Sequence, residues 1–314
     1  METLTKRVAS VLKTTAFVAL ATLILVPASA DADWKTKWSN GHKIESEDGN
    51  FKLKFGGRTQ ADWSFASADS DLEDAVGPVT DGNEFRRARI FFSGTIYKNI
   101  EYKVNYEFSD GGATEIKDLW IKFKPWGIKA GHFHEPFSLE QLTSSKYITF
   151  LERSLPDTFA PGRNTGIAYS NSSDSYTFGL GVFRDTDDFG VGTAEDRINI
   201  TGRFVWRPMY DKDRMLHLGF GFTDKSAEDG DTVRFRQRPE AHLSPRFVNT
   251  NSFAYDGLTS YNGELAGRFG PWWFASQYIT SEVDSAVGGD PSFDSFYVQS
   301  GYFLTGESRA YKNS

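Results

Sequence analysis

The sequence predicts an all-β protein whose antiparallel strands form a barrel across a membrane. Apolar and polar side chains alternate with a period of two in about twelve segments, as in β-strands, whose successive side chains point to opposite faces. Tight turns and long loops alternate between these segments, and aromatic residues lie near many segment ends. Short turns on one side and long loops on the other are typical of outer-membrane barrels. A soluble β-sandwich explains the alternation but neither of the other two observations.

The first residues have the pattern of a signal peptide for export from a bacterial cytoplasm. Lys6, Arg7 and Lys13 provide positive charge, residues 14–26 are a short apolar run, and Ala-Ser-Ala at 28–30 matches a signal-peptidase site. The apolar run is shorter than the length that a transmembrane helix needs to span a bilayer. The expected organisation is a signal peptide (1–30), a short N-terminal periplasmic segment (31–48) and a barrel domain (49–314).

Residues 51–65 give the clearest strand. Odd positions such as Leu53 and Trp63 are mostly apolar, whereas the even positions include Lys54 and Arg58. Taken alone, this run fits a soluble sandwich about as well as a barrel, although a strand that crosses a bilayer needs only about 9–11 residues. The later segments with this alternation are residues 85–96, 100–108, 115–124, 128–133, 165–169, 176–183, 198–207, 216–223, 261–269, 273–280 and 296–303.

Composition excludes several classes of function. The 314 residues include 35 Lys and Arg against 42 Asp and Glu, a formal net charge of −7, which argues against a nucleic-acid partner. There is no cysteine, so thiol catalysis and disulfides are excluded. None of the five histidines lies in a hydrolase or metalloprotease motif, and His132 and His134 have only Glu135 as an acidic neighbour. We therefore expect no enzyme, catalytic residue, cofactor or metal.

Parity along each strand predicts which side chains line the interior. A Lys or Arg on the lipid face near the midplane costs ~2–4 kcal/mol, so these residues should point inward. Acidic residues concentrate in the loops instead, which predicts a cation-lined pore that favours anions, including phosphate-like oxyanions. The inward set is Lys52, Lys54, Arg58, Arg87, Arg89, Lys103, Lys122, Lys124, Lys129, Arg203 and Arg207.

Two further segments stand apart from the regular strands. Residues 134–163 lose the period of two over about thirty residues, and loops of this length usually carry function. The extended piece at 233–238 places Arg234, Arg236 and Arg238 on one face, about 6.6 Å apart, as a ladder along which an anion could pass. A basic loop surface without such a role explains this piece about equally well.

The sequence resembles the phosphate-selective porin O and P family of Gram-negative outer membranes. The resemblance rests on FKLKFGGRTQADW (51–63), EFRRARIFFSGT (84–95), GHFHEPFSLEQLTSSKYITFLERSL (131–155) and YFLTGESRAYK (302–312). It implies an outer-membrane homotrimer of sixteen-stranded barrels, in contact with lipid, each with a loop folded inward as a constriction, here residues 134–163. The site residues that it implies are constriction arginines Arg58, Arg87 and Arg153, ladder arginines Arg234, Arg236 and Arg238, and periplasmic lysines Lys35, Lys37, Lys54 and Lys129.

Three positions depart from the pattern of the phosphate-specific members. Gln141 stands in place of a loop lysine, His134 in place of a tyrosine, and Lys117 in place of an aspartate, next to Asp118. These departures favour general anion selectivity, phosphate included, over strict orthophosphate specificity. The expected function is passive diffusion of anions, with phosphate or polyphosphate as the favoured substrates. A general anion or small-solute porin is the alternative, and an outer-membrane enzyme or a soluble exported binding protein is disfavoured.

The number of strands is the remaining question. About twelve strands cannot close a sixteen-stranded barrel, and an open sheet edge is not tolerated in lipid. The sequence is therefore interpreted as a truncated chain that lacks about four strands, and a closed twelve-stranded barrel is the less favoured alternative.

Overall fold

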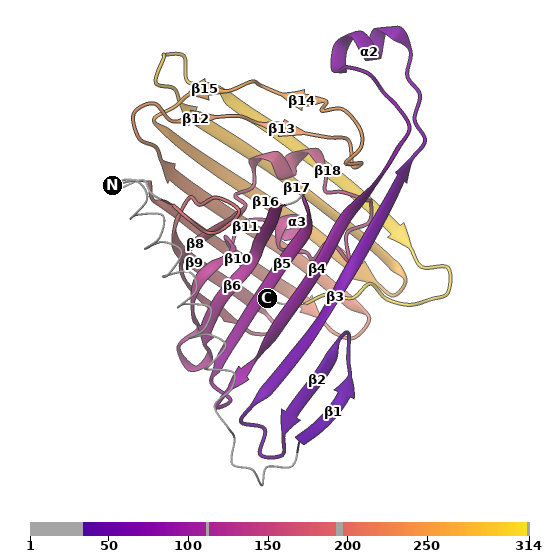
Figure 1. Ribbon diagram of the computed structural model, residues 1–314, viewed down its shortest axis with the longest axis vertical. Helices are drawn as coiled ribbons and strands as arrows, with labels where there is room; N and C mark the ends of the chain where they lie inside the picture. Colours follow the sequence, from indigo (N-terminus) through magenta and orange to yellow (C-terminus); the bar gives the residue numbers. More distant parts are fainter. Residues whose placement is uncertain (1–33, 111–112, 193–196, 313–314) are drawn as a thin grey trace.

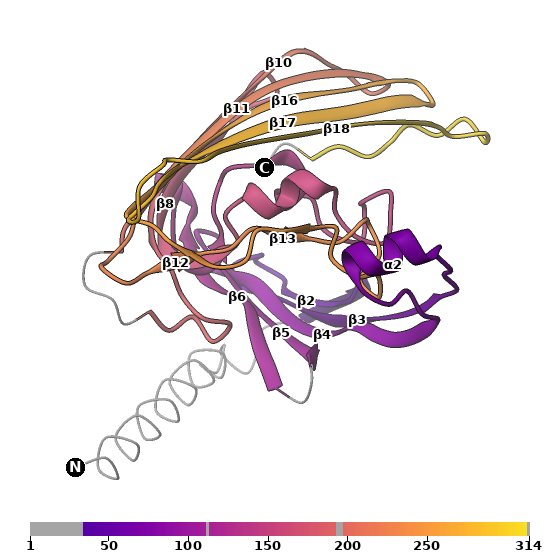
Figure 2. The same ribbon diagram turned by 90° about the horizontal axis from the view of Figure 1, so that it is seen from above.

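The computed structural model describes residues 34–110, 113–192 and 197–312. They form one fourteen-stranded antiparallel sheet in which nearly every strand pairs with its neighbours in the sequence, and the sheet curls around a central space (Figures 1 and 2). The predicted signal peptide lies outside the described residues. The strands of the sheet are β1 (Trp34–Trp38), β2 (His42–Ser46), β3 (Lys52–Ser64), β4 (Gly82–Ile96), β5 (Ile100–Asp110), β6 (Ala113–Phe123), β7 (Ile128–His134), β8 (Arg163–Ser172), β9 (Tyr176–Arg184), β10 (Asn199–Tyr210), β11 (Arg214–Ser226), β16 (Gly257–Phe269), β17 (Trp272–Asp284) and β18 (Ser292–Tyr302).

The prediction of an antiparallel sheet with about twelve long strands is confirmed. Twelve of the fourteen strands, β3 to β11 and β16 to β18, are 7 to 15 residues long. The other two, β1 and β2, form a hairpin beside β3 within the predicted N-terminal segment. The outermost strands of the sheet are β1 and β18, and these two are not paired with each other in the part of the chain that the structure describes.

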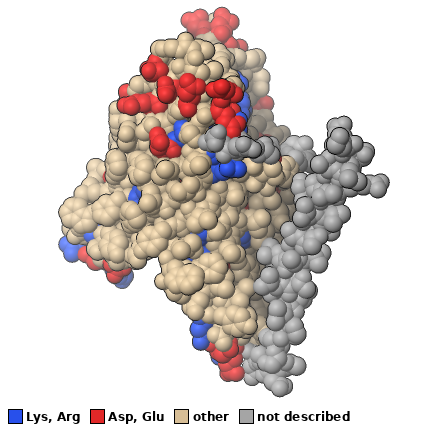
Figure 3. Space-filling model, turned by 90° about the vertical axis from the view of Figure 1, so that its left-hand side faces the viewer, with Lys and Arg blue, Asp and Glu red and all other residues tan. Residues whose placement is uncertain are grey.

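Burial along the strands is inverted relative to a water-soluble sheet. In β9 the outward residues Phe178, Leu180 and Val182 are exposed, and the inward residues between them are buried. In β10, Phe204 is exposed whereas Arg203 is buried. Figure 3 shows the result as a broad uncharged band, with charged residues gathered above and below it. An apolar outer face with a polar inner face is the arrangement that a bilayer requires.

The connections alternate in length as predicted. A tight turn at residues 125–127 joins β6 to β7, and Gly127 adopts a positive φ of 66° there. A Cβ at Gly127 would lie 2.4 Å from the carbonyl oxygen of Ser170, so the turn needs glycine. At the opposite end most links are long, with the short link from β5 to β6 as an exception. The long links carry the small elements α2 (Ser70–Val76), α3 (Leu139–Leu142), η2 (Leu155–Phe159), β12 (Thr232–Val233), β13 (Arg236–Gln237), β14 (Val248–Asn249) and β15 (Phe253–Ala254); η1 (Lys124–Trp126) is part of the tight turn.

Two of the long loops fill part of the interior. The loop between β7 and β8 folds into the curve of the sheet, where Figure 2 shows its short helices, and the loop between β11 and β16 lies beside it. Phe137 and Phe159 of the first loop pack with Phe235 of the second and with Ile279 of the wall strand β17. This hydrophobic cluster fixes both loops against the wall, and it places the irregular stretch 134–163 where an inward-folded constriction loop is expected.

No helix among the described residues has the length and apolar character needed to cross a membrane.

Candidate functional site

The curled sheet and its inward loops enclose a cavity of about 1500 Å³. Seventeen Lys and Arg and nine Asp and Glu line this cavity, although the whole chain is acidic. The lining of the cavity is therefore basic although the chain as a whole is acidic. The inward residues predicted from parity that line it are Lys54, Arg58, Arg87, Arg89, Lys103, Lys122, Lys129 and Arg203.

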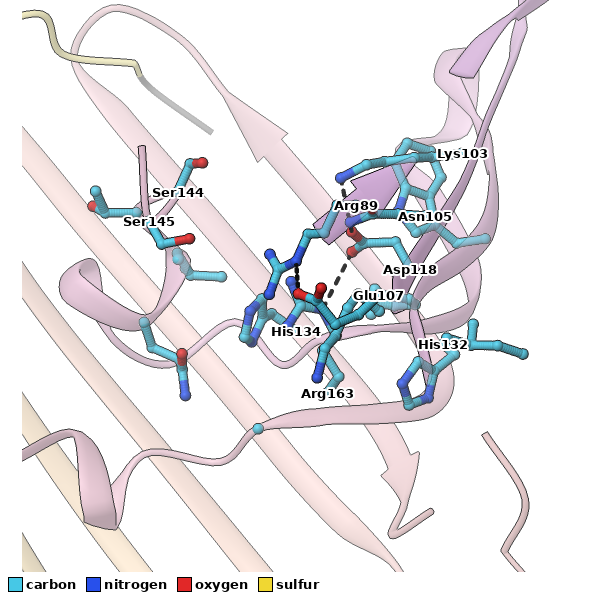
Figure 4. Close-up of a pocket in the computed structure, with 18 of the residues that line it drawn as sticks. Arg89, Lys103, Asn105, Glu107, Asp118, His132, His134, Ser144, Ser145 and Arg163 are labelled. Carbon is cyan, nitrogen blue, oxygen red and sulfur yellow. Dashed lines mark hydrogen bonds and ion pairs between the residues drawn. The ribbon is translucent and has the colours of Figure 1, made fainter. Parts of the chain in front are cut away.

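Arg58 projects from β3 toward the inward loop. Its Nη2 atom donates a hydrogen bond to the hydroxyl of Ser145, at 2.7 Å. Arg89, which lies opposite Arg58 on the neighbouring strand β4, instead donates a hydrogen bond to the carboxylate of Glu107 at 2.5 Å (Figure 4). Within the described residues, Arg58 forms no ion pair with a carboxylate. Its guanidinium therefore keeps its full positive charge for a mobile anion.

Arg87 has a different environment, created by an irregularity in β4. Gln60 pairs with Arg87 but the next residue, Ala61, pairs with Phe85, so Arg86 is the extra residue of a β-bulge. Bulges re-aim side chains, and this one turns Arg86 inward although parity assigns it to the lipid face with Ala88. Both guanidiniums line the cavity and bind the same loop carboxylate, that of Glu152. Sequence parity could not find Arg86 because the bulge shifts the register.

Arg153, the predicted loop arginine, holds the backbone of its own loop. Its Nε donates to the carbonyl oxygen of Glu140 at 3.0 Å, and its Nη2 donates to that of Thr143 at 2.9 Å and that of Gln141 at 3.3 Å. Arg153 still lines the cavity. Three accepting carbonyls fix the guanidinium, so it contributes positive potential from a rigid position at the turn after α3.

A second group of charges surrounds Asp118 on β6 (Figure 4). Lys103 Nζ lies 2.8 Å from one carboxylate oxygen of Asp118, and Arg163 Nε lies 3.5 Å from the other. Lys117, which stands where the phosphate-specific members have an aspartate, forms an ion pair with Glu115 instead. Arg163 was missed by sequence reasoning because it ends the irregular stretch, where no period of two assigns a side chain to a face.

The inward loop is anchored to the wall strands by the carboxylate of Glu264. This carboxylate accepts a hydrogen bond from the backbone amide of Leu139 at 2.8 Å, which fixes the start of α3. It also accepts from Arg203 and contacts Nε2 of His217 at 2.7 Å. The wall strand β11 has no side chain at Gly221, where a Cβ would lie 2.4 Å from the carbonyl oxygen of Phe137. A small residue on β11 thus lets the loop backbone lie directly on the sheet.

The ladder arginines lie on the loop between β11 and β16. Arg236 and Arg238 line the cavity, and Arg234 donates to the side chain of Asn249 at 2.9 Å. Phe235 between them is buried against Phe159, with ring centroids 4.9 Å apart. The alternation therefore anchors the segment through Phe235 while the neighbouring guanidiniums project away from the core.

The four predicted lysines divide between the cavity and the N-terminal hairpin. Lys54 and Lys129 line the cavity, and Lys129 lies over the rings of Trp120 and Phe133 at 4.8 and 4.6 Å. Lys35 and Lys37 lie on the exposed strand β1 and do not line the cavity.

No group of three or more His, Cys, Asp or Glu side chains that could hold a metal occurs among the described residues.

The comparison with known families shows which protein family the chain belongs to. The model of the family "Phosphate-selective porin O and P" matches residues 53–314. The chain belongs to this family. The predicted resemblance is thereby confirmed, and so is the prediction that the protein is not an enzyme, because porins are channels.

Relatives support the same assignment. The chain is 28% identical to Porin O of Pseudomonas aeruginosa over 340 residues, covering 94% of this chain and 76% of that protein. It is 30% identical over 302 residues to an uncharacterised protein of Caulobacter vibrioides, covering 91% of this chain and 59% of that protein. The chain thus spans about three quarters and three fifths of the lengths of these two relatives.

Solved structures show a similar fold. OmpT, an outer membrane protein of Vibrio cholerae, superposes with a TM-score of 0.50 at 14% identity, covering 81% of this chain and 72% of OmpT. Its variant without loop L8 gives 0.51 at 13% identity, covering 81% and 78%. Family membership places this porin in the outer membrane of a Gram-negative bacterium, and the solved structures show that the fold is similar.

Proposed function

We propose that this porin is a passive, anion-selective pore that favours phosphate and polyphosphate. The main support for this proposal is the excess of Lys and Arg over Asp and Glu around the cavity, in a chain whose net charge is −7. Rings of Arg and Lys select for anions, and guanidinium groups match the geometry of oxyanions. Arg58, with the neighbouring Ser145 hydroxyl, supplies the donors for a phosphate oxygen.

In this proposal the remaining predicted residues act along one path. Arg234, Arg236 and Arg238 lie on the loop side and attract anions, Arg58, Arg87 and Arg153 form the constriction, and Lys54 and Lys129 lead toward the periplasm. Lys35 and Lys37, being outside the cavity, would act only through their field at its mouth. A homotrimer embedded in lipid remains the predicted assembly.

A general anion porin is the second candidate, favoured by the pairing of cations with carboxylates. Arg87 binds Glu152, Arg89 binds Glu107, and Lys103 binds Asp118. Each pair lowers the positive potential that a phosphate ion meets. Gln141, which stands in place of a loop lysine, is uncharged and does not restore this positive potential.

Two electrical measurements on the full-length protein in planar bilayers test the proposal. The reversal potential in a potassium chloride gradient should show anion selectivity. Inorganic phosphate should then reduce the chloride conductance at low concentration if phosphate is favoured, and only at concentrations near that of chloride in a general anion pore. Cation selectivity would contradict both candidates.

The selectivity should also depend on pH through Asp157 of the inward loop. Burial raises the pKa of Asp157 to about 7, although Arg153 opposes the shift. The carboxyl is thus neutral below pH 7 and adds a negative charge to the cavity above it. We expect the anion-to-cation permeability ratio to be about twofold higher at pH 6 than at pH 8, since one charge is partly screened across about 10 Å at 0.1 M salt. In Asp157→Asn this part of the pH dependence should be absent, and an unchanged profile would assign the dependence to other groups.

A further inference from the structure

Two neighbouring arginines in the cavity, Arg86 and Arg87, both bind the carboxylate of Glu152, a residue of the same chain. Arg86 Nε and Nη2 lie 2.7 and 3.1 Å from the two carboxylate oxygens of Glu152. Arg87 Nη2 lies 3.0 and 3.1 Å from the same two oxygens. Four donor contacts on one carboxylate form a complete anion-binding geometry.

The wall strands hold the two arginines in position. Arg87 is 3% exposed, and its Nη1 donates to the side-chain oxygen of Gln60 at 2.6 Å, so its orientation is fixed from the wall. Its buried Nε has no hydrogen-bond partner among the described residues. The β-bulge at Arg86 is what brings the second guanidinium to the same side of the strand.

The carboxylate, by contrast, comes from the loop. Glu152 lies on the inward loop, 65 residues away from Arg87 in the sequence, and its backbone amide is held separately by the carbonyl oxygen of Glu240 at 3.1 Å. The side chain can therefore leave the arginines while the backbone stays in place. The two guanidiniums lower the pKa of Glu152 although its burial raises it, so the group is ionised at neutral pH.

We propose that Arg86 joins the constriction residue Arg87 in one oxyanion site, and that Glu152 is a tethered carboxylate that competes with the permeating anion for this site. The inference rests on the proposed anion-selective function. A tetrahedral oxyanion such as phosphate offers the same pair of acceptor oxygens that the carboxylate offers. Glu152 thereby weakens anion binding at this point and keeps an ion from being held too tightly to leave, which conduction requires.

The test is Glu152→Gln, which keeps the shape of the side chain and removes its charge. In bilayers formed with the full-length protein, the phosphate concentration that halves the chloride conductance should fall about tenfold, the change that corresponds to ~1.4 kcal/mol. The anion-to-cation permeability ratio should rise as well. Circular dichroism and heat-dependent electrophoretic mobility verify that the variant folds.

The matched control is Glu84→Gln. Glu84 also lines the cavity, but its carboxylate contacts His242 at 2.9 Å rather than the arginine pair. A clearly smaller effect in this control is expected, and an equal effect would overturn the proposal in favour of a general change of potential. In the triple variant Arg86→Gln, Arg87→Gln, Glu152→Gln the gain in phosphate affinity should disappear.

The remaining outcomes separate this inference from the function on which it rests. If the wild-type pore is anion-selective and inhibited by phosphate but Glu152→Gln leaves phosphate affinity unchanged, the competing carboxylate is overturned while the function stands. If Glu152→Gln raises conductance and lowers anion selectivity, Glu152 only fastens the loop, and the proposal is again overturned. If the wild-type pore is cation-selective, the proposed function itself fails.

Discussion

Replacing Arg58 by glutamine is expected to raise the phosphate concentration that halves the chloride conductance by about 10- to 100-fold. A hydrogen bond to a charged group contributes about 1.5–3 kcal/mol, and each 1.4 kcal/mol corresponds to a factor of ten. Arg58 is the predicted constriction arginine with no carboxylate partner among the described residues, so its loss removes a free charge rather than one half of an ion pair.

One matched arginine variant and one serine variant test whether this result is specific to Arg58. Arg214 pairs with Asp211 at an exposed turn and does not line the cavity, so Arg214→Gln should leave phosphate inhibition unchanged. Ser145→Ala should have a smaller effect than Arg58→Gln, because the hydroxyl adds one neutral hydrogen bond. Unchanged phosphate inhibition in Arg58→Gln would move the binding zone away from β3.

Replacing Glu264 by leucine is expected to be the most destabilising of the substitutions considered, at about 3–5 kcal/mol, because it leaves a buried charge without its partner. The carboxylate of Glu264 is fully buried, and Arg203 beside it is 7% exposed. The substitution also removes the acceptor of the Leu139 amide, so the inward loop should loosen and the conductance should rise. Urea unfolding in lipid vesicles, followed by tryptophan fluorescence, measures the first effect, and single-channel recording measures the second.

A double variant separates the two roles of Glu264. Replacing a buried ion pair by apolar residues of similar volume is often neutral, so Arg203→Met with Glu264→Leu should recover most of the lost stability. It should not recover the loop anchor, since the Leu139 amide still has no carboxylate acceptor. A loss below about 1 kcal/mol in the single variant would mean that water or another group replaces the carboxylate.

The wall of the pore was predictable because the direction of a side chain in a strand is a local property. Leu180 and Phe204 point outward and Arg58 and Arg203 point inward, as the period of two indicates. The tight turn at Gly127 was predictable for the same reason, since a positive φ favours glycine whatever surrounds it. The prediction from periodicity was incomplete at Arg86, where a bulge shifts the register by one residue.

The state of charge of the cavity was not predictable in the same way. Whether an arginine is free or paired depends on residues that the fold brings from far along the chain. Arg58 meets Ser145 across 87 positions, and the Leu139 amide meets Glu264 across 125. No local pattern encodes such contacts, and the loop that makes most of them has no period of its own.

The sequence by itself therefore determined which strand residues face the interior, except at the bulge of Arg86, and it predicted a basic interior, because backbone geometry alternates side chains between two faces. Only the tertiary structure decided how many of those charges are available to an anion. Glu152 pairs with Arg87 and Asp118 pairs with Lys103, two cations that the sequence counts as free, while Arg58 keeps its charge. The physical reason is that pairing depends on distances of a few ångströms between loop and wall, which are set when the inward loop packs against the sheet.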